Sequence, residues 1–153
     1  MHFPVGLSAT GIAMTLATDL AQITVADDRP ITVAGLIITQ SSDVGDAAEE
    51  VLRWGLYRGV TTGSTGGTSL TVTPLQQGGP TPSVTGTTNW TTASTGGTLM
   101  LTGGFNIRVG QELWFPPECR PYVGQAGSPF SFRLLAAPAD SVTIDISVIL
   151  LEG

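Results

Sequence analysis

The sequence contains no lysine, one cysteine and one histidine, and each scarcity excludes a class of site. A Walker-type phosphate loop needs a lysine after its glycines, so Gly66-Gly67 and Gly96-Gly97 are predicted to be turns. A single cysteine, Cys119, permits neither an internal disulfide framework nor a multi-cysteine zinc site. The single histidine, His2, lies at a terminus that usually frays, where it is a poor base for a Ser-His-Asp or Cys-His constellation.

Charge is also sparse, because charged residues make up only 12% of the 153 residues. The six positive charges are all arginine and are scattered along the chain, and the net charge is −6. Binding a phosphate backbone needs clustered positive charge, so nucleic acid is not an expected partner. No uncharged apolar run approaches the roughly 20 residues of a membrane helix, and the N-terminus lacks the basic region of a signal peptide. We therefore expect a soluble protein made in the cytoplasm.

The clearest strand pattern lies near the end of the chain. Apolar and polar residues alternate from 142 to 150, which is the period-two pattern of a strand with one buried face. Ile149 and Leu151 make the end of this strand apolar on both faces, so we expect that portion to be covered on two sides. The length suits one domain, and residues 1–153 are predicted to form a single unit.

Two other segments favour strands. Residues 31–39 are β-branched and follow a proline, which predicts a central strand, and residues 49–60 alternate apolar with polar or small side chains. A helical turn over 46–50 is the alternative for the start of the second segment. Weaker strand candidates are 8–16, 20–26, 69–73, 84–90, 98–102, 105–109, 112–115 and 130–136. Many short strands punctuated by Gly and Pro predict an all-β fold, an antiparallel β-sandwich or jelly roll with extended loops.

An internal repeat marks two loops. Thr-Thr-Gly-Ser-Thr-Gly-Gly-Thr at 61–68 returns as Thr-Thr-Ala-Ser-Thr-Gly-Gly-Thr at 91–98. The Pro- and Gly-rich stretch 74–82 is predicted to be an extended arm or loop, and 115–121 is a second irregular stretch. These segments are the candidate contact surfaces, with Thr65, Gly66, Gly67, Gln76, Gln77, Thr95, Gly96, Gly97, Pro116, Pro117 and Arg120 as candidate interface residues.

The densest acidic stretch is 41–50, where Asp43 and Asp46 are weak candidates for binding Ca²⁺. The spacing does not match an EF-hand loop, and a solvated loop or a subunit contact is the favoured interpretation. Cys119 is interpreted as a small, half-buried loop residue, because only Arg120 nearby in sequence offers the positive charge that activates a thiolate. We expect no catalytic residue, no cofactor and no small-molecule substrate.

Aromatic side chains leave one ligand class open. Trp54, Trp90 and Trp114 would suit a sugar- or base-stacking platform, whereas core or interface packing is the favoured role. A carbohydrate-binding module is therefore an alternative function for this chain.

The sequences of several segments resemble those of a known group of proteins. Ala17-Thr18-Asp19-Leu20, then residues 40–46 running into Glu50-Val51-Leu52-Arg53, and the tail at 135–143 resemble small proteins encoded among phage structural genes. In composition the chain is most similar to the jelly-roll capsid decoration (cement) proteins, which are all-β, acidic and poor in lysine. The resemblance implies a non-enzymatic protein of the virion, at the capsid surface, that forms a homotrimer and binds the major capsid protein and neighbouring copies of itself. A tail, spike or head-fibre base component is the alternative within the same class.

Overall fold

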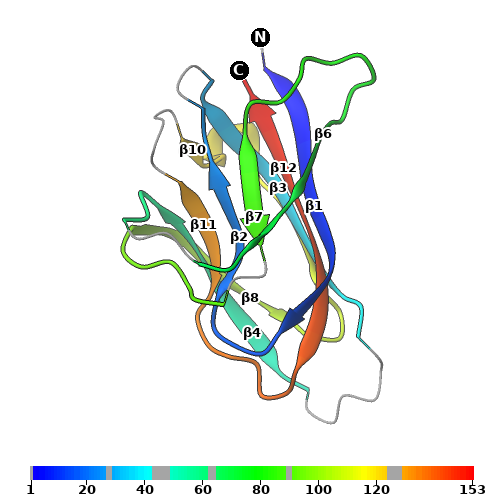
Figure 1. Cartoon of the computed structure of the whole chain (residues 1–153), viewed down its shortest axis with the longest axis vertical. Coiled ribbons are helices and arrows are strands. Elements are labelled where there is room, and N and C mark those ends of the chain that lie inside the picture. Colours follow the sequence, from blue (N-terminus) through cyan, green and yellow to red (C-terminus); the bar gives the residue numbers. More distant parts are fainter. Residues whose placement is uncertain (1, 27–28, 43–48, 62–64, 89–90, 124–128) are drawn as a thin grey trace.

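The protein is described here by a computed structural model, which covers residues 2–26, 29–42, 49–61, 65–88, 91–123 and 129–153. Two antiparallel β-sheets pack face to face in a β-sandwich (Figure 1). The predicted fold class is thereby confirmed at the level of the sandwich. In the part of the chain that is described, no helix is long and apolar enough to cross a membrane.

The first sheet, sheet A, carries both ends of the chain. Its strands follow the order β10-β3-β12-β1-β6, and β9 also pairs with β3. Their bounds are β1 (Phe3–Met14), β3 (Ile31–Gln40), β6 (Thr71–Pro74), β9 (Gln111–Trp114), β10 (Tyr122–Val123) and β12 (Val142–Glu152). Phe3 pairs with Glu152, so the two termini lie side by side (Figure 1).

The second sheet, sheet B, has the order β5-β7-β2-β11-β4-β8. Its strands are β2 (Asp19–Thr24), β4 (Val51–Arg58), β5 (Thr68–Ser69), β7 (Thr85–Thr88), β8 (Thr98–Asn106) and β11 (Phe130–Leu134). A short 3-10 helix, η1 (Pro117–Cys119), interrupts the proline-rich segment that was expected to be irregular.

The strongest strand predictions are confirmed. Val142, Ile144 and the alternate residues that follow are buried along β12, and β3 lies inside sheet A between β12 and the short strands β9 and β10. Residues 51–58 form β4, and Glu49 and Glu50 before it are not helical. Ile149 and Leu151 are half-buried, so their outer side is only partly covered.

Three boundaries differ from the sequence prediction because pairing partners decide them. β1 starts at Phe3 because it pairs with β12 as far as Glu152. The two candidates at 98–102 and 105–109 merge into β8, because Gly103 receives the ring of Trp54 and the pairing with β4 continues. The candidate at 69–73 divides at the buried Leu70, where the chain passes from sheet B to sheet A.

The core lies between the sheets and draws on both. Inward side chains of β1, β3 and β12 meet those of β2, β4 and β11 in one apolar cluster. Trp54 and Phe132 make an edge-to-face pair with ring centroids 5.9 Å apart, and the Trp54 indole N–H donates to Gln111 Oε1 at 2.9 Å.

Candidate functional site

The two sequence repeats connect the two sides of sheet B in opposite directions. The first repeat joins β4 to β5, and the second joins β7 to β8. β4 and β8 are neighbours on one side of sheet B, whereas β5 and β7 are neighbours on the other side. The repeats must therefore pass each other above the central strands β2 and β11.

Where they pass, the repeats bind each other reciprocally. The backbone N–H and hydroxyl of Thr61 donate to the Thr95 carbonyl at 3.2 Å and 3.3 Å. The backbone N–H and hydroxyl of Thr91 donate to the Thr65 carbonyl at 3.0 Å and 2.9 Å. Thr61 and Thr91 are the first residues of their repeats, and Thr65 and Thr95 are the fifth. We call this local two-fold arrangement the repeat clasp.

Glycine is required at the sixth place of each repeat. Gly66 and Gly96 have φ angles of +77° and +71°, which L side chains rarely adopt. A Cβ on Gly66 would run into the Thr91 hydroxyl, and a Cβ on Gly96 would run into the Thr61 hydroxyl. The repeated sequence therefore encodes both the donors of the clasp and the space that they need.

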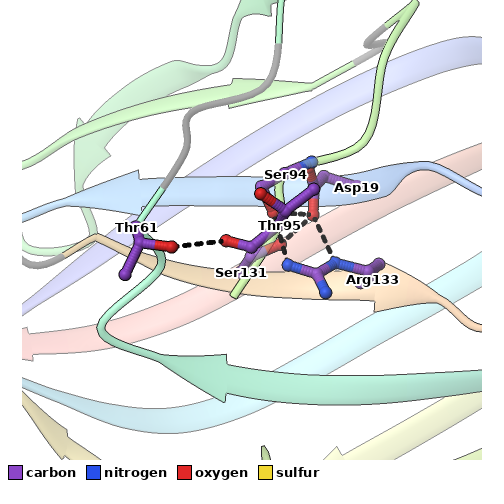
Figure 2. Close-up of polar contacts among 6 residues, drawn as sticks. All are labelled: Asp19, Thr61, Ser94, Thr95, Ser131 and Arg133. Atoms are coloured by element: carbon purple, nitrogen blue, oxygen red, sulfur yellow. Dashed lines mark hydrogen bonds and ion pairs between the residues drawn. The ribbon is translucent and has the colours of Figure 1, made fainter. Parts of the chain in front are cut away.

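A buried carboxylate holds the second repeat against sheet B. Ser131 and Arg133 alternate with inward aromatic and leucine residues along β11, so they lie on the outer face, and Arg133 pairs with Asp19 of β2. Asp19 is fully buried, and its two oxygens accept from the backbone N–H of Ser94 at 2.6 Å and the Ser94 hydroxyl at 2.8 Å (Figure 2). The Ser131 hydroxyl donates to the same carboxylate.

An arginine completes this cluster. Arg133 Nε lies 3.4 Å from Asp19 Oδ1, and Nη2 donates to the Ser94 hydroxyl at 2.7 Å (Figure 2). The Arg133 guanidinium also stacks over the Tyr57 ring, 4.2 Å from its centroid. Ser94 both donates and accepts, and the Asp19 carboxylate accepts from three residues, so these groups cross-link a loop to two strands. We call Asp19, Ser94, Ser131 and Arg133 the polar anchor.

A second buried carboxylate ties down the stretch predicted to be an arm. Glu152 on β12 is fully buried and accepts from the backbone N–H of Ser83 at 2.9 Å and from the Ser83 hydroxyl. Arg29 lies 3.8 Å from Glu152 and donates to the Thr81 carbonyl at 3.1 Å, and its guanidinium stacks on Phe3. One end of the 74–82 segment is therefore attached to sheet A.

Comparisons of the chain with protein-family models, with curated proteins and with solved structures found no match.

The structure places the predicted interface residues at the surface, with one qualification. All of them are exposed except Arg120, which is half-buried and donates to the Phe115 carbonyl at 3.1 Å. Within the two repeats, however, the carbonyls of Thr65 and Thr95 face the opposite repeat of the same chain. Gln76 and Gln77 lie in a turn closed by a hydrogen bond from Gly79 N–H to the Gln76 carbonyl.

Two other predictions concern a metal site and the single cysteine. Asp43 and Asp46 lie outside the described residues, and among the described ones no group of three His, Cys, Asp or Glu side chains could hold a metal ion. Cys119 is exposed, which corrects the expectation of a half-buried residue: η1 turns it outward at the end of the proline-rich segment.

The three tryptophans have different surroundings. Trp54 is 2% exposed in the core, so it cannot be part of a stacking platform. Trp114 is 57% exposed and its ring lies against Gly35 of β3. Trp90 lies outside the described residues.

The polar anchor was not predicted from the sequence. A charged residue inside the apolar run Phe130 to Leu134 was a usable signal, because an arginine in a central strand needs a partner. Its partner, Asp19, is distant in the chain and could not be identified from the sequence alone.

Proposed function

We propose that the protein is a non-enzymatic virion structural protein that decorates a phage capsid, binds the major capsid protein and assembles with copies of itself as a homotrimer. The observation that carries the proposal is a pair of exposed aromatic side chains on one sheet. Trp114 is 57% and Tyr122 is 55% exposed, and their strands β9 and β10 pair with the same strand, β3. Trp and Tyr in such positions are the residue types that dominate binding energy at protein interfaces.

The buried polar groups support the same function. Among the described residues, the two fully buried carboxylates, Asp19 and Glu152, accept hydrogen bonds that attach loops to sheets. A sandwich with its loops fastened in this way presents a surface that needs little ordering on binding, which reduces the entropic cost of association. The low charge and acidic balance of the chain suit a partner recognised by shape, apolar contact and neutral hydrogen bonds.

Decoration would act through differential affinity. A protein that binds only the mature shell stabilises that state, and an oligomer that engages several sites at once gains from the high effective concentration of the second and third contacts. No chemical step is involved.

The direct test is binding to empty capsids of the source phage. Purified protein is titrated against expanded capsids, and bound copies per shell are counted by quantitative mass spectrometry of the pelleted particles. Saturation at hundreds of copies, with an increase in the temperature at which the shells break, is the expected result. A handful of copies per particle would instead indicate a tail, spike or head-fibre base component, and no binding would overturn the virion proposal.

A carbohydrate-binding module is the second candidate, because the Trp114 side chain is 57% exposed. Quenching of tryptophan fluorescence by soluble glycans, lost in Trp114→Ala, would support it. A glycan array without signal would reject it.

A further inference from the structure

The outer face of sheet A is broad and has few charges. The side chains that point away from the core on β1, β3, β9, β10 and β12 alternate with buried ones, and they are mostly apolar or hydroxyl-bearing. The larger apolar members are Pro4, Ile37, Trp114, Tyr122, Ile149 and Leu151, and Leu75 joins them after β6. We call this surface the sheet A face.

A row of apolar side chains crosses the middle of this face. Ile149 pairs with Gly6 of β1 on one side and with Gly35 of β3 on the other. Leu75, which is 54% exposed, packs over Gly6, and the Trp114 ring packs over Gly35. Because glycines flank Ile149, the side chains of Leu75 and Trp114 lie over the positions on either side of it.

Charge on the sheet A face is limited to two carboxylates among its described residues. Asp145 accepts from the backbone N–H of Gly11 at 2.7 Å and from the Ser41 hydroxyl at 3.1 Å, and Glu112 lies near one edge on β9. Two copies of a chain with net charge −6 repel each other, so contact is least unfavourable where the charge is lowest.

The opposite side of the sandwich differs in character. The centre of the outer face of sheet B carries Asp19, Ser131 and Arg133, and the chain's own second repeat covers it. None of the described residues covers the sheet A face in this way. Contact with a partner would bury the apolar area that the half-buried Ile149 and Leu151 still expose.

We infer that the sheet A face packs against a neighbouring copy of this chain. From strand spacing and rise, the face has a footprint on the order of 650 Å², similar to the roughly 800 Å² that each partner buries in a stable interface. Interfaces between identical chains are more apolar at their centre than the surrounding surface, and Leu75, Ile149 and Trp114 give this face an apolar centre. The inference rests on the proposed function in one respect, that the protein works as an assembly of copies.

Two substitutions test the inference by different means. Trp114→Glu places a charge in the apolar row at a side chain that is mostly exposed, so the fold is retained. Ser147→Arg adds a bulky side chain to the middle of β12 on the same face without removing an apolar contact. The mass of each variant is measured by sedimentation velocity over a range of concentrations, with circular dichroism as the check on folding.

Matched controls separate this face from the rest of the surface. Val109→Glu makes a similar change at a residue that is 80% exposed after β8, and Thr85→Arg adds the same bulk at the exposed first residue of β7. We expect an oligomer for the unaltered protein and both controls, and a dissociation constant raised by roughly 30-fold or more in the two test variants. A monomeric unaltered protein, or test variants that associate like the controls, would overturn the inference.

Capsid binding distinguishes the two proposals. If the protein oligomerises through the sheet A face but ignores capsids, the decoration function fails and this inference stands. If a monomeric protein binds capsids and Trp114→Glu abolishes that binding, the face belongs to the shell contact and the inference is wrong.

Discussion

Thr61 and Thr91 hold equivalent places in the two repeats, and each donates its backbone N–H and hydroxyl to the fifth residue of the other repeat. The sequence duplication thus has a structural counterpart, a local two-fold clasp above sheet B. Because each repeat supplies the donors of one half and the acceptor of the other, the clasp needs both repeats. The polar anchor then fastens the second repeat through Ser94.

Adding a methyl group at Gly96 should open the clasp. Gly96→Ala incurs the cost of a positive φ and also displaces the Thr61 hydroxyl, so we expect a loss of about 2–3 kcal/mol in the free energy of unfolding by urea. Gly78→Ala is the matched control, because Gly78 has φ +76° with nothing within 4 Å of an added Cβ. It should lose only about 1 kcal/mol. Equal losses would mean that the clasp contributes nothing to stability.

Neutralising Asp19 should destabilise the fold. Asp19→Asn leaves Arg133, whose side chain is 15% exposed, without its ionic partner and offers amide hydrogens to groups that are already donors. We expect a loss of about 3 kcal/mol in urea unfolding, together with faster hydrogen exchange of the Ser94 amide. Asp140→Asn, at an exposed position, should change stability by less than about 0.5 kcal/mol. If the hydrogen-exchange rate of the Ser94 amide were unchanged, Asp19 would not anchor the second repeat.

Removing the charge of Glu152 should loosen the end of the 74–82 segment. Glu152→Gln weakens the bonds from Ser83 and the contact with Arg29, so we expect a loss of about 1–2 kcal/mol and faster exchange of the Ser83 amide. Glu118→Gln, an exposed carboxylate in η1, is the control. If Ser83 exchanged at the same rate in both variants, the segment would be held by other contacts.

Gly35 and Trp114 should be energetically coupled. A Cβ on Gly35 would lie 2.7 Å from Trp114 Cε3, so Gly35→Ala must displace the ring. We expect Gly35→Ala to cost at least about 1 kcal/mol more in the natural background than in Trp114→Ala, measured as a double-mutant cycle of unfolding free energies. Additive effects would show that the ring does not rest on Gly35.

Strand identity was readable for the long strands that bury one face. The alternation in β12 and the β-branched run of β3 predicted both strands, because a period of two follows from strand geometry. Their ends were less predictable: β1 extends to Phe3 only because β12 supplies a partner there, and β8 continues through Gly103 because the Trp54 ring fills that space.

The sequence by itself determined the all-β class, the low charge, the repeated loops and the positions of their glycines, because composition and short-range patterns encode these properties. Only the tertiary structure decided that the repeats bind each other, that Asp19 meets Arg133 and Glu152 meets Ser83, and that Leu75 and Trp114 share one face with Ile149. The reason is physical: these partners are far apart in the chain, and only the strand order of the two sheets brings them within hydrogen-bonding or van der Waals distance.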